Sequence, residues 1–287
     1  MQITKTIKGL KHSLCSEANI AFVPTMGNLH AGHIQLVEVA KRHAKCVVVS
    51  IFVNPLQFGP TEDLASYPRT LEADCEKLRT AGASIVFTPS VKEMYPQMTE
   101  SESDGINLNQ TMTITPPPIA SELCGASRPG HFSGVATVVM KLFNIVQPDV
   151  AVFGQKDFQQ LFIIKQLVKQ FNLPINIISV DTVREESGLA LSSRNSYLTD
   201  VQRTSASQLY SALQNIKNAL KNADNDFNRL EKLAIATLTS QGWLVDYISV
   251  RSAITLEPAC STDSHIVVLG AAKLGNTRLI DNIEFLR

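Results

Sequence analysis

Apolar positions along the first two-thirds of the chain follow two alternating periods. Short apolar runs predict strands over residues 20–23, 46–53, 84–88, 149–153 and 175–180. Between them, apolar residues recur at helical spacing and predict helices over residues 33–44, 71–81, 134–146 and 158–171. The run 46–53, CVVVSIFV, is rich in β-branched residues and is typical of a strand covered on both faces. The alternation predicts an α/β fold with a Rossmann-like, doubly wound parallel sheet.

The pattern changes after residue 180. Two helices with polar faces are predicted over residues 200–220 and 226–241, followed by strands over 246–251, 265–272 and 277–284. We therefore expect a domain of residues 1–180 and a smaller C-terminal α+β domain of residues 181–287. Residues 98–124 are rich in Ser, Thr, Asn and Pro and predict a loop or flap with short irregular strands. An insertion without a role would fit their composition equally well.

Composition narrows the class of protein. The 287 residues are 44% hydrophobic and 18% charged, as in ordinary globular proteins, and Lys+Arg and Asp+Glu both number 26. The zero net charge argues against a general nucleic-acid or anionic-membrane binder, although it permits a local basic pocket. The first residues lack the apolar core of a signal peptide, and no run approaches the roughly 20 apolar residues of a membrane span. We expect a cytoplasmic protein.

Five scattered cysteines form no CxxC pair. Their odd number and spacing argue against a disulfide framework and against a zinc site. We expect buried, reduced thiols.

A predicted strand becomes a predicted helix at residues 24–33, PTMGNLHAGH. In open α/β sheets, ligands bind beyond the carboxyl ends of strands, where helix N-termini suit phosphate. Gly27 can take a positive φ, and Gly32 leaves space between His30 and His33, which would project to the same side. Two imidazoles there could stabilise charge on a phosphate. A helix cap or a metal-binding pair is also compatible with the two histidines.

Two further segments are also suited to bind phosphate. Residues 153–157, FGQKD, follow a predicted strand and open a helix, so Lys156 would bring positive charge to a triphosphate. Residues 189–195, LALSSRN, place two hydroxyls and a guanidinium in tandem, although such a turn alone is common. Together the three segments predict a nucleotide site.

These segments resemble, in order, those of the pantothenate synthetases (pantoate–β-alanine ligases), members of the HIGH-motif nucleotidyltransferase superfamily. The resemblance covers nearly the whole chain. It includes residues 24–33, 49–58 (VSIFVNPLQF), 67–71 (YPRTL), 125–132 (GASRPGHF), 154–160 (GQKDFQQ) and 191–195 (LSSRN). The C-terminal domain is less distinctive, although residues 278–282 (RLIDN) are also similar to the family.

The resemblance implies an ATP-dependent condensation of (R)-pantoate with β-alanine, with Mg²⁺. The products would be pantothenate, AMP and pyrophosphate, formed through a pantoyl-adenylate. It also implies a homodimer whose C-terminal domain closes over ATP, and neither a nucleic-acid nor a membrane partner.

Site residues follow from the same resemblance. It implies His33 as general acid, with His30, Lys156 and Arg194 also catalytic, and Gln57 and Gln160 as pantoate-binding residues, Gln57 also lying near β-alanine. No residue is assigned as a metal ligand. Arg128 and His131 lie in a family motif without an assigned contact, and Gln155 replaces the Glu that is common in the family. The expected ATP contacts are Met26, Gly27, Asn28, Leu29, His30, Ala31, Gly32, His33, Gly154, Gln155, Lys156, Asp157, Val183, Leu191, Ser192, Ser193 and Arg194.

Two other functions remain open at this point. One is another HIGH-motif adenylyl- or nucleotidyltransferase, which would have no use for an amine acceptor. The other is an ATP-binding protein without turnover. The intact set His30, His33, Lys156 and Arg194 argues against the second.

Overall fold

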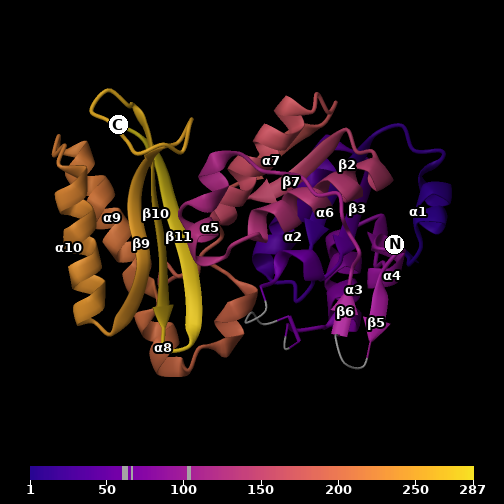
Figure 1. Cartoon of the computed structure of the whole chain (residues 1–287), viewed down its shortest axis with the longest axis horizontal. Coiled ribbons are helices and arrows are strands. Elements are labelled where there is room, and N and C mark those ends of the chain that lie inside the picture. Colours follow the sequence, from indigo (N-terminus) through magenta and orange to yellow (C-terminus); the bar gives the residue numbers. More distant parts are fainter. Residues whose placement is uncertain (60–63, 66, 102–104) are drawn as a thin grey trace. The chain divides into compact units, whose positions relative to one another are not determined.

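Six parallel strands form the larger sheet, in the order β1-β4-β3-β2-β7-β8 (Figure 1). The structure is a computed structural model that describes residues 1–59, 64–65, 67–101 and 105–287. The strands are β1 Gln2–Thr4, β2 Ile20–Thr25, β3 Cys46–Ile51, β4 Ile85–Phe87, β7 Val150–Gly154 and β8 Asn176–Val180. The predicted α/β class with a doubly wound parallel sheet is confirmed.

Helices cover both faces of this sheet. One core layer joins Phe22 and Phe87 to apolar residues of α1, α6 and α7, and the other joins Val23 and Val49 to α2 and α3. The helices are α1 Ile7–Leu14, α2 Ala31–His43, α3 Leu71–Ala81, α4 Val91–Met94, α6 His131–Val146 and α7 Phe158–Gln170. Since both faces are buried, the central strands are almost continuously apolar, as the run of residues 46–53 predicted.

The strand order reverses between β2 and β7. From β2 the chain winds through β3 to β4 on one side, and from β7 it continues to β8 on the other. In such sheets the crevice beyond the carboxyl ends of the strands at this switch point is the usual ligand site. The segment with His30 and His33 follows β2, and Gly154 ends β7.

The chain forms two compact units that interleave in sequence before residue 181. One compact unit, unit 1, comprises Met1–Ser121, Arg128–Gln155 and Gln160–Val180. The other, unit 2, comprises Glu122–Ser127, Lys156–Gln159 and Asp181–Arg287. Two short segments that precede residue 181 thus group with the C-terminal residues, and one of them contains Lys156.

Unit 2 contains a three-stranded antiparallel sheet in the order β11-β10-β9. Helices α9 and α10 pack along one face of it through an apolar layer (Figure 1). Its larger elements are α8 Asp200–Ser205, α9 Ser207–Lys221, α10 Phe227–Ser240, β9 Trp243–Ser252, β10 His265–Leu274 and β11 Thr277–Leu286. The short elements are α5 Cys124–Ser127, η3 Gln155–Asp157 and η4 Ser193–Tyr197.

Three differences from the predicted elements have physical causes. The pair β1–α1 was not predicted, because three strand residues and eight helical ones are shorter than the windows over which a period is read. Helix α2 begins two residues before the predicted start, at a cap formed by His30. The predicted helix 200–220 is interrupted at Ala206, where the Thr204 and Ser205 hydroxyls donate to carbonyls four residues back, a pattern that bends helices.

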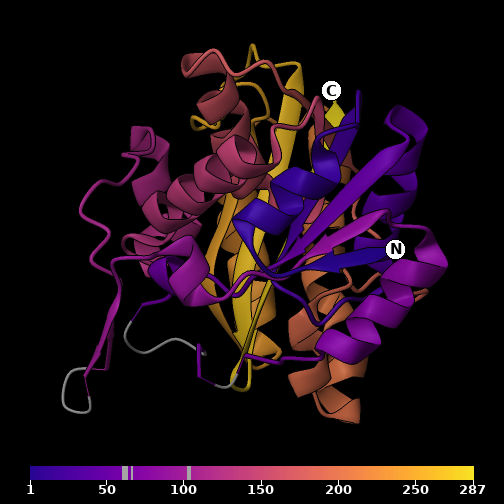
Figure 2. The ribbon, with the colours of Figure 1, turned by 90° about the vertical axis from the view of Figure 1, so that its right-hand side faces the viewer.

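The segment predicted as a loop or flap is mostly irregular. It contains the short antiparallel pair β5 Thr99–Ser101 and β6 Gly105–Asn107 and the turn η2 Pro118–Ser121. In Figure 2 the β5–β6 pair extends away from the helices and the parallel sheet of unit 1. Residues 102–104 of the predicted flap lie outside the described residues.

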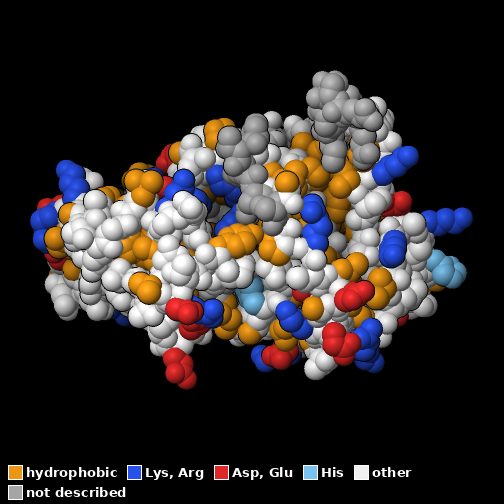
Figure 3. Space-filling model, turned by 90° about the horizontal axis from the view of Figure 1, so that it is seen from below, with side chains coloured by type: hydrophobic (Ala, Val, Ile, Leu, Met, Phe, Trp, Pro, Cys, Tyr) orange, Lys and Arg blue, Asp and Glu red, His pale blue; other side chains and the backbone are white. Residues whose placement is uncertain are grey.

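Charge is mixed on the face of the molecule that Figure 3 shows. Figure 3 shows Lys and Arg side chains interspersed with Asp and Glu side chains on the face in view, in keeping with their equal numbers. Within the described ranges, no helix has the length and apolar character that a membrane span requires.

Candidate active site

The turn between β2 and α2 is pinned by a buried carboxylate. Gly27 has φ +84° and Asn28 φ +50°, so the backbone takes the predicted left-handed conformation at Gly27. Asp74 on α3 is fully buried, and its two oxygens accept the backbone N–H groups of Asn28 and Leu29, each at 2.8 Å. Lys77, one helical turn further, donates from Nζ to the carbonyl of Leu29 at 2.6 Å. Helix α3 therefore holds the chain that leads into the histidines.

The two histidines cap helix α2. The Nδ1 atom of His30 accepts the N–H of Gly32 at 3.2 Å, and Nδ1 of His33 accepts the N–H of His30 at 3.3 Å. The ring centroids are 4.1 Å apart, which confirms that both side chains project to the same side. An Nδ1 atom that accepts a hydrogen bond carries no proton, so in each neutral ring the hydrogen is on Nε2. The arrangement places two Nε2–H donors side by side at a helix N-terminus.

Among the described residues, no group of three or more His, Cys, Asp or Glu side chains is arranged to hold a metal ion. The capping interpretation is confirmed, since each ring accepts a backbone N–H through its Nδ1 atom.

Gln57 is oriented by a chain of buried side chains. The Tyr95 hydroxyl donates to Oδ1 of Asn54 at 2.6 Å, and Nδ2 of Asn54 donates to Oε1 of Gln57 at 3.1 Å. Burial raises the pKa of Tyr95, which keeps its hydroxyl protonated as a donor. With its carbonyl oxygen engaged, Gln57 directs its amide nitrogen toward the sulfur of Met26 at 3.1 Å. The structure thus brings together two predicted site residues, Met26 and Gln57, and presents a hydrogen-bond donor.

The backbone of Gln57 is held by helix α6. At Gly134 a Cβ atom would lie 2.4 Å from the carbonyl oxygen of Leu56 and 2.7 Å from Cα of Gln57, so only glycine permits this approach. Nδ1 of His131 lies 2.9 Å from the Gln57 carbonyl, and its Nε2 lies 2.9 Å from a guanidinium nitrogen of Arg128. Arginine only donates, so Nε2 accepts and Nδ1–H donates to Gln57. The unassigned motif residues Arg128 and His131 position Gln57.

A cavity of about 690 Å³ opens in unit 1 beside the histidine turn. Met26, Gly27 and Asp74 contribute to its wall, together with residues at the carboxyl ends of β1, β3 and β4. This volume is in the range of small-molecule sites.

Unit 2 gathers the other predicted nucleotide residues. Ser192 caps η4 by accepting the N–H of Arg194 at 3.3 Å, and the N–H of Leu191 donates to the carbonyl of Val183 at 2.9 Å. Lys156 and Ser192 line the same small cavity, of about 10 Å³. Lys156 and the Ser-Ser-Arg turn, more than thirty residues apart in sequence, are therefore neighbours in the fold.

The predicted site residues thus fall into two sets. Unit 1 contains residues 26–33, Gln57, Gly154, Gln155 and Gln160, and unit 2 contains Lys156, Asp157, Val183 and residues 191–194. Gln160 lies half-buried on α7, whereas its neighbour Gln159 is buried and bonded to the backbone of Cys124 and Glu122.

Sequence reasoning missed Asn54, Asp74 and Tyr95, which orient the predicted residues. Asp74 had a detectable signal, because helical spacing places this carboxylate on the apolar stripe of Cys75 and Leu78. For Tyr95 and Asn54, which meet across 41 residues of sequence, no local pattern could show the contact.

The chain is similar over its whole length to proteins of one kind. A family model described as pantoate-beta-alanine ligase matches residues 2–284. A pantothenate synthetase of Methylobacillus flagellatus is 61% identical over 285 residues, which cover 99% of each chain. A pantothenate synthetase of Thermus thermophilus has a crystal structure with a TM-score of 0.90 and 39% identity, over 99% of each chain.

A further solved structure contains ligands. The pantoate-beta-alanine ligase of Francisella tularensis, crystallised in complex with beta-gamma ATP and beta-alanine, is 38% identical with a TM-score of 0.79. The match covers 100% of this chain and 97% of that one.

Proposed function

This chain belongs to the pantoate–β-alanine ligase family, and we propose that it joins (R)-pantoate to β-alanine through a pantoyl-adenylate, cleaving ATP to AMP and pyrophosphate. The single observation that carries this proposal is the pair of Nε2–H donors of His30 and His33 at the N-terminus of α2. They lie just beyond β2, at the switch point where open α/β sheets bind nucleotides. The ATP and β-alanine complex of the Francisella tularensis relative supports the same ligands here.

In the first step, a pantoate carboxylate oxygen attacks the α-phosphorus of ATP and pyrophosphate leaves. Carboxyl groups titrate near pH ~4, so pantoate needs no general base. The protein must bring two anions together and stabilise the charge that builds up on the phosphate. We assign this task to His30 and His33 as hydrogen-bond donors from Nε2, and to Lys156 and Arg194. A neutral His33 would stabilise the phosphate charge through this hydrogen bond, in place of the general-acid role that the resemblance implies.

In the second step, the amine of β-alanine attacks the carbonyl carbon of the adenylate, AMP leaves as the C–N bond forms, and one N–H proton passes to solvent. The amine must be unprotonated to attack. We propose that the free amine binds directly from solution, and we assign no residue as its base.

Gln57 and Gln160 are proposed to recognise pantoate. Because Asn54 occupies the carbonyl oxygen of Gln57, the Gln57 amide offers a donor, which suits a carboxylate or hydroxyl oxygen of pantoate. A neutral amide adds no charge that would compete for phosphate. β-Alanine would approach from the side of Gln57.

The remaining ATP contacts are proposed from the family resemblance. They are residues 26–33, Gly154, Gln155, Lys156, Asp157, Val183 and residues 191–194. Mg²⁺ is usually held by one or two carboxylates together with substrate phosphates. We propose that Mg²⁺ would be bound chiefly by the ATP phosphates and would neutralise part of their charge.

Three further properties follow from the resemblance and stay predictions. They are a homodimeric assembly, a cytoplasmic location, and closure of residues 181–287 over ATP held by residues 1–180. Light scattering of the purified protein measures the first, and X-ray scattering with and without ATP and pantoate measures the third.

Isotope exchange tests the reaction. Pantoate alone should support incorporation of labelled pyrophosphate into ATP, and β-alanine alone should not. With both acids, ATP should yield AMP, pyrophosphate and pantothenate in equal amounts. Release of ADP and phosphate would exclude the adenylate mechanism, and failure to consume β-alanine would favour a nucleotidyltransferase that uses no amine.

A substitution at His33 can distinguish its role as a helix cap from its proposed role as a hydrogen-bond donor to phosphate. In His33→Asn, the amide oxygen can still accept the N–H of His30, whereas the Nε2–H donor is lost. Exchange should fall roughly 10²- to 10⁴-fold with little change in stability. His43→Asn, at the exposed end of the same helix, is the matched control. Near wild-type exchange by folded His33→Asn would refute the assignment.

A further inference from the structure

Arg184 binds Asp281 with a two-pronged ion pair inside unit 2. Its guanidinium nitrogens lie 2.6 and 2.8 Å from the two carboxylate oxygens, and the Asp281 side chain is only 4% exposed. The same guanidinium donates to the carbonyl of Gly188 and stacks 3.8 Å above the ring of Tyr210. These three partners fix the position of the guanidinium group. Bidentate geometry and stacking are properties of arginine that lysine does not share.

Arg184 in turn fastens a narrow hairpin. Arg184 pairs with Ala190 across the hairpin, and the next rung is the hydrogen bond from Leu191 to Val183. Both rungs adjoin the Ser-Ser-Arg turn. The ion pair with β11 therefore determines where Val183 and residues 191–194 lie within unit 2.

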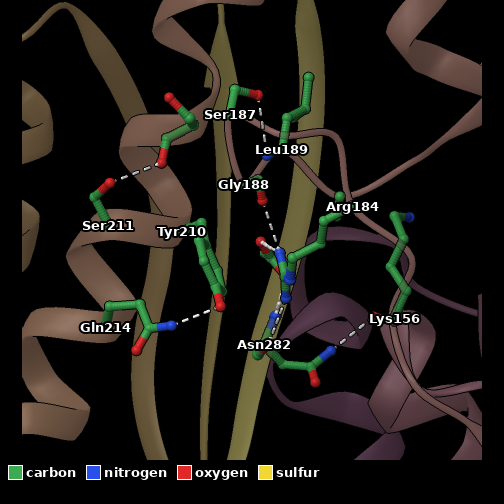
Figure 4. A network of polar contacts seen from close by, with 12 residues as sticks. Lys156, Arg184, Ser187, Gly188, Leu189, Tyr210, Ser211, Gln214 and Asn282 are labelled. Atoms are coloured by element: carbon green, nitrogen blue, oxygen red, sulfur yellow. Dashed lines mark hydrogen bonds and ion pairs between the residues drawn. The ribbon is translucent and has the colours of Figure 1, made fainter.

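Asn282, which follows Asp281 on β11, bonds to the segment that contains Lys156. Asn282 is buried, and its Nδ2 donates to the main-chain carbonyl of Lys156 at 2.9 Å (Figure 4). Its own N–H donates to Oδ1 of Asp281 at 2.7 Å, and its carbonyl accepts from Arg184 at 3.2 Å. One dipeptide, Asp281-Asn282, thus bonds both the Lys156 segment and the hairpin.

We propose that Asp281 and Asn282 are positioning residues that set the distance between Lys156 and the 183–194 segment, and so determine how well unit 2 holds the phosphates of ATP. The inference rests on the proposed ATP role of Lys156 and the Ser-Ser-Arg turn. Neither β11 residue is needed to touch the nucleotide. Their effect should therefore pass through the Lys156 side chain and depend on the number of phosphates.

The test uses calorimetric titration of the full-length protein with ATP and with AMP. Asn282→Ala should weaken ATP binding roughly 5- to 30-fold, the effect expected for one lost buried hydrogen bond. AMP binding and the KM for pantoate should change less than about twofold. In a Lys156→Ala background, Asn282→Ala should have little further effect on ATP, because the group that it positions is absent.

Two other variants protect the test against a folding defect. Arg184→Lys keeps the positive charge but loses the bidentate ion pair with Asp281 and the stacking on Tyr210. It should therefore weaken ATP binding roughly 3- to 10-fold and leave AMP binding nearly unchanged. Arg229→Ala removes an exposed ion pair between Arg229 of α10 and Asp224, so it should change the affinity for neither ATP nor AMP. Thermal unfolding of each variant establishes that it is folded.

The outcomes separate this inference from the proposed function. Wild-type protein that binds ATP without pantoate-dependent exchange would refute the proposed function alone, and the binding comparison would still decide the inference. Normal wild-type exchange with equal losses for ATP and AMP, or with additive effects of Asn282→Ala and Lys156→Ala, would overturn the positioning role. Absence of ATP binding in wild-type protein would refute both.

Discussion

Asp74→Asn probes how the histidine turn is built. The carboxylate is fully buried, and it accepts N–H groups of Asn28 and Leu29 on separate oxygens and a hydroxyl from Thr70 at 3.1 Å. An asparagine of the same shape must place its NH₂ group at one of the two oxygen positions. In either orientation one backbone N–H then faces another donor. The substitution removes charge without creating a cavity, so its effect isolates the hydrogen bonds.

The cost can be worked from these contacts. Leaving one buried N–H group unsatisfied costs about 1–3 kcal/mol. The remaining bonds lose the contribution of a charged acceptor, which adds about 1 kcal/mol. The free energy of unfolding should therefore fall by about 2–4 kcal/mol. Because the turn leads directly into His30, pantoate-dependent exchange should also fall at least about tenfold.

Urea unfolding at neutral pH measures the first effect and pyrophosphate exchange the second. Glu76→Gln is the matched control, since it removes one carboxylate from the same helix at a side chain that is 68% exposed. Its free energy of unfolding should stay within about 0.5 kcal/mol of wild type. If Asp74→Asn were as stable and as active as Glu76→Gln, the turn would not depend on the buried carboxylate.

Three other predictions concern substrate selection and buried groups. Gln57→Ala and Gln160→Ala should raise the KM for pantoate roughly three- to a hundredfold and leave ATP binding, measured by calorimetry, nearly unchanged. Weaker ATP binding with an unchanged KM for pantoate would mean that these residues line the ATP pocket and not the pantoate pocket. Burial raises the pKa of the Cys46 thiol to about 11, so iodoacetamide near pH ~8 should label exposed Cys260 and spare Cys46 in the folded protein, and equal labelling by mass spectrometry would contradict this. Burial also raises the pKa of Glu231, so the folded state holds this proton more tightly than the unfolded state. Urea unfolding should show that the free energy of unfolding of wild type falls, relative to that of Glu231→Gln, as the pH rises from the pKa of Glu231 in the unfolded state to its raised pKa in the folded state. Above the folded-state pKa the difference between the two proteins should be constant. A difference that did not depend on pH would refute the raised pKa.

The fold was predictable where each element buries a face of its own. Helix α3 has the predicted bounds, residues 71–81, because its apolar residues repeat at helical spacing and Gly82 ends it at φ +84°. Strand β1 was not predictable in this way. It has three residues, and its pairing of Gln2 with Ile85 joins positions more than eighty residues apart. Local patterns contain no information about such a partner.

In the candidate site, too, some residues could be predicted from local sequence and others could not. Residues in turns that follow strands were found by position and resemblance, since phosphate sites recur there. The residues that orient them were not, because their partners are distant in sequence: Asp281 meets Arg184 across 97 residues, and Asn282 meets Lys156 across 126. Residues 278–282 resemble the family, but a resemblance alone does not say what a residue contacts.

The histidine pair shows how two competing interpretations become one. From the sequence, a helix cap and a phosphate-binding site were alternatives for His30 and His33. In the structure each ring caps through Nδ1, and this bond requires the neutral tautomer with its hydrogen on Nε2. Protonation of Nδ1 would break the cap, so the start of α2 favours neutral rings that donate from Nε2. The structural role of these histidines therefore sets the hydrogen position on which their proposed chemical role depends.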